Sequence, residues 1–332
     1  MVWLSDNDRD ARLDEIHDLV AQRHLHYPSP IVFEGNAPAA LAENDLLERT
    51  LDTVPVSAPP IGRAWFGAPN SIKGPTEAHF QRQSGNHLLI VGQRDEAALS
   101  MLAISLISLA AQYPVGTVRF VLIQSTTPGS SEAELLDRVC AAVPHPITVS
   151  RGPEIPQIMA DLAAELKARS SGEAPPDAPT TYVLIHGLHR FKKLRQEDDF
   201  SFSMSDDAAA NPGALFAELI TEGSSFGMHV LVTVDTFNNV NRCMSRKALT
   251  EFEMRVVFQM SANDSASLID SPKASNLGLH RALYYNEQAG TLETFRPYAA
   301  PDSGWLAQAA ARLQDTKRIH PPTPEVKAAA GS

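Results

Sequence analysis

The sequence predicts an α/β fold of three layers, in which helices cover both faces of a mostly parallel central sheet. From residue 87 onward, short apolar segments alternate with longer helical segments, which is the order of a parallel sheet with crossover helices. The apolar segments, such as residues 87–91 and 182–185, are continuous, as in strands that are buried on both faces. The 332 residues are 43% hydrophobic, which is enough for a substantial core.

The chain is expected to begin with a helical extension over residues 1–60. Its first helix, over residues 8–24, carries Leu13, Ile16 and Leu19 at helical spacing.

The later elements follow from apolar runs, helical periodicity and the Gly and Pro residues between them. Strands are expected at residues 31–33, within 64–80 (broken by turns), and at 87–91, 117–123, 147–149, 182–185, 229–234, 254–260, 282–285 and 292–295. Helices are expected at residues 39–51, 96–113, 131–143, 155–170, 212–222 and 246–252. The helix over residues 96–113 is apolar nearly all round, which suits a helix buried against a sheet.

These elements predict one large domain over residues 61–300. Residues 301–332 are expected to form a C-terminal helix and a disordered tail, because the tail is rich in Pro and Ala.

The overall charge limits the classes of partner. There are 28 Lys and Arg against 39 Asp and Glu, so the net charge is −11. A chain this acidic is not a general nucleic-acid binder, although a local basic patch is compatible with it. The 2 cysteines indicate a reducing, cytoplasmic compartment, and no apolar run approaches the roughly 18 residues that a membrane span needs.

The first strand-to-helix turn occupies the place where a nucleotide-binding protein has the phosphate loop GxxxxGK[ST]. The residues to compare are Gly92, Asp95, Glu96, Ala97, Ala98 and Leu99. Ala98 stands where a Lys would reach the phosphates, and Leu99 stands where a hydroxyl would bind Mg²⁺. Asp95 and Glu96 add negative charge where the phosphates would lie, but acidic residues suit the start of a helix. The residues alone therefore favour a structural turn.

The paired acids of an ATPase are also replaced. The strand at residues 182–185 is followed by His186 and Gly187 where an Asp and a Glu would hold Mg²⁺ and orient water. His186 and His189 lack a nearby third ligand, so we expect ordinary loop residues and no metal site.

Taken together, these segments resemble the motor domain of the FtsK/SpoIIIE/HerA superfamily of DNA translocases. The resemblance covers about residues 60–300. It rests on the segments GNHLLIVG, YVLI, EGSSFGMHVLVTV, EMRVVFQMSANDSASLID, ASNLG and RALYY, which occur in the family's order and spacing. It implies a RecA-like P-loop NTPase fold.

The resemblance also assigns positions near the nucleotide. The family's polar sensor falls on Asp235, while Arg255, Asp264 and Ser265 keep the family's residue types at a place that lies near the subunit boundary of a ring. Arg255 is therefore a candidate inter-subunit residue. The alternative is that it pairs with Asp264 or Glu253 and only holds the fold.

The departures imply a catalytically degenerate ATPase module without ATP hydrolysis or a cofactor of its own. Its partners would be other ATPase modules, in a ring that translocates DNA. Candidate DNA contacts are Arg190, Lys192, Lys193 and Arg195. Alternatively, the chain docks a protein substrate, as in type VII secretion motors, which the sequence also resembles; the acidic loop at residues 196–211 is a further candidate docking segment. An ATPase that is active through rearranged residues is the third alternative.

Overall fold

The computed structural model describes residues 4–23, 37–195 and 211–315. The chain divides into two compact units, Met1–Glu34 and Gly35–Ser332. The expected strand at residues 31–33, the tail after residue 315 and nearly all of the acidic loop lie outside the described residues.

The first unit contains helix α1 (Asp6–Gln22), close to its predicted bounds. Ser5 caps its start by accepting a hydrogen bond from the Asp8 amide at 3.2 Å. No residue of α1 is buried, and its side chains Leu13, Ile16 and Leu19 are exposed.

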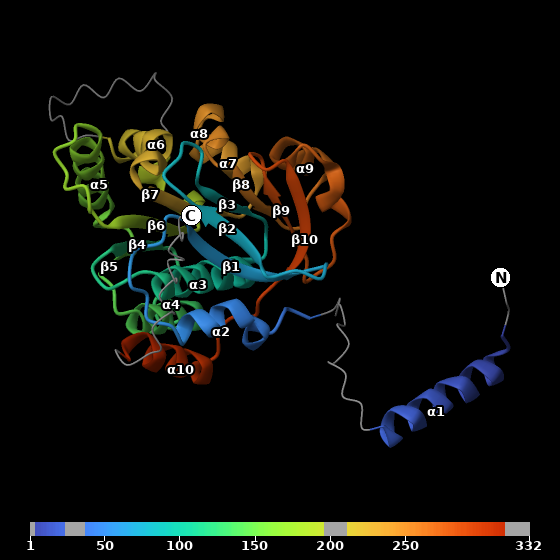
Figure 1. Ribbon diagram of the computed structural model, residues 1–332. Helices are drawn as coiled ribbons and strands as arrows, with labels where there is room; N and C mark the ends of the chain where they lie inside the picture. Colours follow the sequence, from blue (N-terminus) through green and yellow to red (C-terminus); the bar gives the residue numbers. More distant parts are fainter. Residues whose placement is uncertain (1–3, 24–36, 196–210, 316–332) are drawn as a thin grey trace, which may run out of the picture. The chain divides into compact units, whose positions relative to one another are not determined.

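The second unit is built on one sheet. Its described strands are β1 (Gly62–Pro69), β2 (Thr76–Phe80), β3 (Leu88–Val91), β4 (Val118–Gln124), β5 (Ile147–Ser150), β6 (Thr180–His186), β7 (Met228–Val234), β8 (Met254–Val257), β9 (Ala282–Asn286) and β10 (Thr291–Pro297). They lie in the order β2-β1-β10-β9-β8-β3-β7-β6-β4-β5 (Figure 1). The strands from β8 to β5 in this order are parallel, and the remaining pairs are antiparallel.

Helices cover both faces of the sheet (Figure 1). On one face lie α2 (Asp45–Leu51), α3 (Asp95–Gln112), α4 (Ser131–Ala142) and α10 (Ser303–Gln314). On the other lie α5 (Ile155–Ser170), α6 (Pro212–Glu222), α7 (Phe237–Cys243), α8 (Arg246–Thr250) and α9 (Ala262–Ile269). Alternate residues of β3 serve the two cores, since Leu88 and Ile90 pack on the first face and Leu89 and Val91 on the second. The predicted three-layer architecture is confirmed.

Helix α3 is the central element of the first core. Every residue from Ala98 to Ala111 is buried, because β1 covers one side of the helix and α2 and α4 cover others. By length and composition alone, α3 resembles a membrane span, contrary to the expectation that no run comes close; 78% of it is buried inside the protein, so it serves as a core helix.

The second unit begins before the expected boundary at residue 61. Ala39 pairs with Tyr298 beyond β10, and the side chains of Leu47 and Leu51 are fully buried in the first core. Glu48 accepts hydrogen bonds from Trp305 and Arg312 of α10. Residues 39–60 and α10 therefore belong to the compact unit, because long-range packing that no local pattern reveals attaches them to it.

Candidate functional site

The connection from β3 to α3 is too short to wrap a phosphate group. Only Gln93 and Arg94 separate Gly92 from the helix, which begins at Asp95. A phosphate loop has four residues between its two glycines. Here Asp95 and Glu96, the last of those four, already belong to the first turn of α3.

Gly92 is required by its surroundings. Its φ is +146°, which L side chains rarely adopt, and a Cβ built on it would lie 2.6 Å from the Cβ of Phe258. Its amide donates to the Val234 carbonyl at 3.0 Å. The glycine therefore allows close contact between the ends of neighbouring strands.

The next positions of the expected loop face the core. Ala98 is 4% exposed and Leu99 is 2% exposed. The amide of Ala98 donates to the Arg94 carbonyl at 2.9 Å within the helix, so it is engaged and cannot bind a ligand. Ala97 is half-buried beside the same core.

No carboxylate follows β6 at the end where this strand faces α3; His186 and Gly187 stand there instead. His186 is 6% exposed, and burial lowers its pKa to about 4, so its ring is neutral near pH 7. Its Nδ1 lies 3.5 Å from the Ser125 hydroxyl. Gly187, with φ of +73°, donates its amide to Thr233 Oγ1 at 2.8 Å.

Asp235, just after β7, is engaged within the protein. Its Oδ1 accepts a hydrogen bond from Asn239 Nδ2 at 2.7 Å and lies 3.5 Å from His189 Nδ1. Burial lowers the pKa of His189, and Asp235 opposes this shift. The predicted sensor position thus holds the start of α7 and the turn after β6 together.

An ion pair connects the two sides of this corner. Arg190 Nη2 lies 3.5 Å from Asp95 Oδ2. The cavity enclosed by Gly92, Asp95, Ala98, His186, Gly187, His189, Arg190, Thr233, Val234 and Asp235 is about 10 Å³. That is room for about one water molecule and not for a phosphate group with its Mg²⁺. We call these residues the closed corner.

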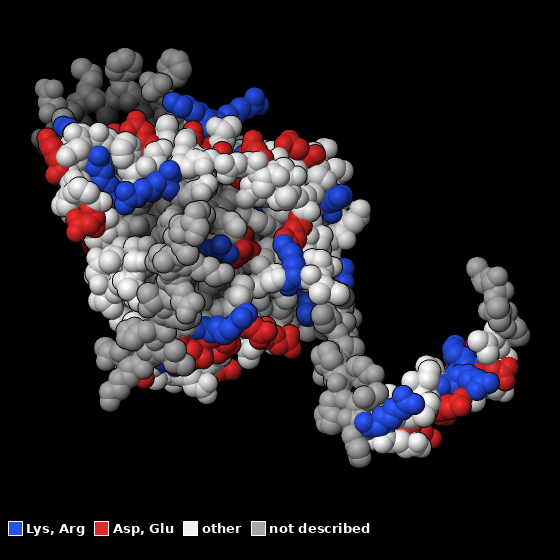
Figure 2. All heavy atoms as spheres, in the orientation of Figure 1, with Lys and Arg blue, Asp and Glu red and all other residues white. Residues whose placement is uncertain are grey.

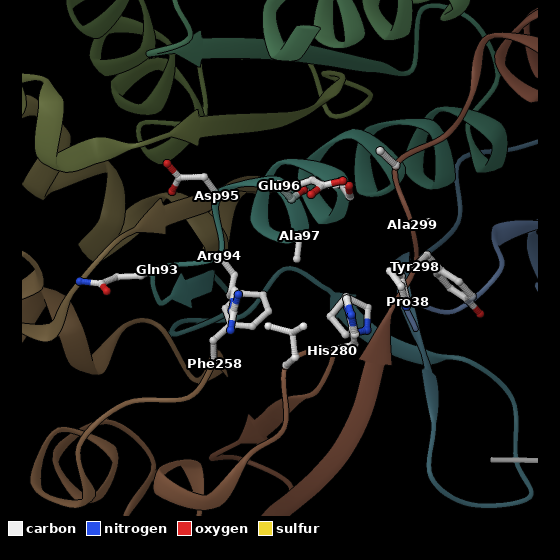
Figure 3. Close-up of a pocket in the computed structure, with 14 residues that line it drawn as sticks. Pro38, Gln93, Arg94, Asp95, Glu96, Ala97, Phe258, His280, Tyr298 and Ala299 are labelled. Atoms are coloured by element: carbon white, nitrogen blue, oxygen red, sulfur yellow. Dashed lines mark hydrogen bonds between the residues drawn. The ribbon is translucent and has the colours of Figure 1, made fainter. Parts of the chain in front are cut away.

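A larger cavity of about 300 Å³ opens on the other side of the β3–α3 connection. In Figure 3, Arg94, Phe258 and His280 converge on this space, whereas Asp95 points away from it. Tyr298 and Leu279 complete its apolar part. The described residues hold no group of three or more His, Cys, Asp or Glu side chains that could bind a metal ion.

Arg255 is a buried structural residue in this chain. Its side chain is 8% exposed and donates to the carbonyls of Phe252 and Leu268 and to Glu287 Oε2, the last at 2.7 Å. These contacts occupy most of the guanidinium. The expected partners Asp264 and Glu253 are therefore replaced by Glu287, and the guanidinium makes its hydrogen bonds within the chain.

Asp264 and Ser265 lie in α9, and Ser265 is also internal. Its hydroxyl donates to the Ser271 carbonyl and accepts from the Ala274 amide at 3.2 Å. Asp264 lies in the first turn of α9, half-buried, where its charge complements the helix dipole.

The predicted cations lie at the carboxyl ends of β4, β5 and β6, where a groove of about 590 Å³ opens. Arg190, Lys192 and Lys193 line it together with Arg151, and we call it the basic groove. Arg195 does not reach it; this residue is half-buried and donates to the His189 carbonyl at 2.7 Å.

Arg151 was not among the sequence candidates. It directly follows β5, so its membership of the basic groove could have been inferred from the strand pattern, because carboxyl ends of parallel strands meet at one edge. On the face shown in Figure 2, cations and carboxylates are interspersed, in keeping with the overall acidic charge.

No family model matches the chain, and no curated protein matches it. Solved structures do. The cytoplasmic domain of the type VII secretion ATPase EccC from Thermomonospora curvata aligns with a TM-score of 0.59 at 14% identity, over 84% of this chain and 34% of that one. EssC (ATPases 2 and 3) from Geobacillus thermodenitrificans aligns at 0.52 and 14% identity, over 86% and 51%. The pCW3 conjugation coupling protein TcpA, with ATPγS, aligns at 0.55 and 14% identity, over 80% and 75%.

The chain has a RecA-like ATPase fold. The resemblance to FtsK/SpoIIIE-type motor domains is thereby confirmed at the level of the fold, and the chain spans about a third and a half of the first two structures. At this identity the similarity concerns architecture alone, so function has to be argued from the residues.

Proposed function

We propose that this chain is a catalytically degenerate, FtsK-like ATPase module that acts through contacts within a larger cytoplasmic DNA-translocating assembly. The observation that carries the proposal is the closed corner. Asp95 and Arg190 pair across the space that a nucleotide's phosphates and Mg²⁺ would need, and the cavity left is about 10 Å³.

The chemistry of the corner supports the absence of turnover. Phosphoryl transfer depends on cations and Mg²⁺ that stabilise charge on the transferred group. At the positions that supply them, the chain has Ala98, Leu99, His186 and Gly187. Arg190 is a cation, but it is paired with Asp95. The two carboxylates of the corner, Asp95 and Asp235, already have partners, and no described Lys lines it.

The partners proposed for such a module are other ATPase modules, in the same chain or in a neighbour. The similar EssC structure from Geobacillus thermodenitrificans comprises ATPases 2 and 3, which supports a place beside other modules. Arg255 and Ser265 would support such an interface indirectly, by fixing β8 and α9.

Calorimetry with Mg²⁺ and ATP on the whole chain tests the proposal. We expect no phosphate release and no binding heat from the closed corner up to millimolar ATP. Binding with turnover would overturn the proposal, as would binding that persists when Lys192→Glu and Lys193→Glu remove the nearby cations of the basic groove.

A second candidate function is protein docking, as in a type VII secretion-like motor, and the larger cavity favours it. Its apolar walls at Phe258, Leu279 and Tyr298, with Arg94 at the edge, suit an apolar side chain flanked by an acid. EccC (ATPases 2 and 3) from Thermomonospora curvata, in complex with a signal sequence peptide, aligns at a TM-score of 0.50 and 13% identity.

Leu279, which is 56% exposed, provides a test of docking. A candidate export-signal peptide, fluorescently labelled, should bind the whole chain and lose binding in Leu279→Asp. Ile72→Asp, at another exposed apolar side chain, is the matched control. Equal binding by both variants would refute docking at this cavity.

A further inference from the structure

The basic groove has the composition of an anion-binding site. Four cationic side chains, Arg151, Arg190, Lys192 and Lys193, line it at the carboxyl ends of three parallel strands. This edge of an open α/β sheet is where ligands bind. The cations come from two connections that are distant in sequence, those after β5 and β6.

The lysines are the unsatisfied charges of this set. Arg151 lies 3.1 Å from Asp137, and Arg190 lies 3.5 Å from Asp95. Lys192 and Lys193 are exposed, and neither forms an ion pair with any residue in the described part of the chain. The groove therefore holds two positive charges that an anion could neutralise.

A buried donor at the base of the groove is also unsatisfied. Gln124, the last residue of β4, is fully buried and lines the groove. Its Oε1 accepts from Thr126 Oγ1 at 2.6 Å, whereas its Nε2 has no hydrogen-bond partner among residues 4–23, 37–195 and 211–315. A buried amide without an acceptor is unfavourable, and this one lies beneath the cationic groove, so we test it as a donor to a bound anion.

Helix α5 adds only a weak favourable field, because the charged Glu154 carboxylate stands at its N-cap. Gly152 and Pro153, just before its start, line the groove, and no described side chain caps the helix at Glu154. Pro156 lacks an N–H, so the helix contributes its dipole more than hydrogen-bond donors. The Glu154 carboxylate is engaged by the Ser150 hydroxyl at 2.8 Å.

We infer that the basic groove binds a phosphate group. A phosphate offers three strong acceptor oxygens and up to two negative charges, which match the two unpaired lysines, with Arg151 and Arg190 beside them, better than a single carboxylate does. The phosphate belongs either to a nucleic-acid backbone or to a free organic or inorganic phosphate. This site shares Arg190 with the closed corner but occupies a different cavity, and the inference extends beyond the proposed function.

Two probes distinguish the sources. Fluorescein-labelled oligothymidylate is titrated by anisotropy, and pyrophosphate is titrated by calorimetry, both with the whole chain at low salt. Binding of the oligonucleotide alone identifies a backbone site, and binding of pyrophosphate identifies a site for the phosphate group itself. Binding should weaken as salt rises, because phosphate contacts release counterions.

The combined substitutions Lys192→Glu and Lys193→Glu are expected to lower the affinity for the probe that binds by about tenfold or more. The matched control is Lys167→Glu with Lys247→Glu, which changes the net charge equally at lysines outside the groove. Absence of binding by both probes, or equal weakening in the control pair, would overturn the inference.

Gln124→Leu provides a second, independent variant. It removes the unpartnered amide from a buried position, so we expect weaker probe binding with unchanged or increased thermal stability. Unchanged affinity in this variant would remove Gln124 from the site. If the binding heat of ATP disappears when the two lysines are replaced, ATP binds in the groove. If that heat remains, ATP binds elsewhere and the proposal of a closed corner is contradicted. The two proposals can therefore fail independently.

Discussion

The closed corner and the basic groove lie side by side at the same edge of the sheet, share Arg190, and differ in how their polar groups are satisfied. In the closed corner, Asp95 meets Arg190 and Asp235 meets His189 around about 10 Å³ of space. In the basic groove, the lysines form no ion pair with a described residue around about 590 Å³. The place where a fold usually binds its ligand is therefore not always the place where a given chain has charged groups without partners.

The largest effect is expected when the phosphate-loop residues are restored. Ala98→Lys with Leu99→Thr places polar groups where the side chains are nearly fully buried. We expect a loss of about 4 kcal/mol in the free energy of unfolding and no gain of ATP binding. Urea unfolding and calorimetry measure these. Recovery of ATP hydrolysis would mean that the corner lacks only the phosphate-binding and Mg²⁺-binding side chains, and that its backbone is not what prevents binding.

Gly92→Ala tests the backbone of the closed corner. The left-handed φ and the contact with Phe258 predict a loss of about 3 kcal/mol in unfolding free energy. Gly129→Ala, also at positive φ but with open space around it, should cost less. Equal losses would show that strain alone, and not the close packing at β3, decides the effect.

The pH dependence of stability separates the neutral corner from the charged groove. The folded-state pKa of His186 is about 4, below its ordinary 6.5, so the unfolded chain binds the proton first as pH falls. Its contribution to stability is present above pH 6.5 and is lost between 6.5 and 4. The wild type should lose about 2 kcal/mol more than His186→Asn between about pH 7 and 5.

Urea unfolding of both proteins at the two pH values measures this difference. His87 and His229, which are fully buried with pKa values lowered by burial to about 3 and about 4, act in the same direction in both proteins and cancel in the comparison. Parallel losses in wild type and variant would show that His186 is accessible to protons in the folded state.

The smallest expected effect concerns the ion pair itself. Arg190 and Asp95 are 49% and 64% exposed, so a double-mutant cycle with alanine should give a coupling free energy of only about 0.5 kcal/mol. Arg190→Ala should also weaken probe binding to the basic groove, whereas Asp95→Ala should leave it unchanged or strengthen it. If Asp95→Ala changed ATP binding by more than this small coupling free energy, then the ion pair, and not the short loop, would be what closes the corner.

Much of the fold followed from local pattern. The predicted helices at residues 155–170 and 212–222 have the observed bounds, because apolar spacing and a Pro near each start mark them clearly. Helices α7 and α9 were not predicted. Both are short and partly polar, and they depend on caps at Thr236 and Ser261 and on buried residues such as Leu268.

The sequence predicts which residues stand at the site, but it does not predict how their side chains are arranged. The replacement of the phosphate-binding residues is visible in the sequence at positions 97–99. By contrast, the partner of Arg255 is Glu287, on a turn that only the antiparallel pairing of β8 with β9 brings close. Likewise, Arg195 is adjacent in sequence to the groove residues, yet it turns inward to His189.

The layers of the fold can be predicted from the sequence, because strand and helix periodicities and apolar runs depend on neighbouring residues. The sequence also determines which residues stand at the phosphate-loop positions. By contrast, the folded chain is needed to see that Arg190 closes the corner, that Arg151 joins the lysines and that the Gln124 amide finds no partner in the described part of the chain. These depend on which strand ends meet, and that is set by long-range packing of the whole sheet.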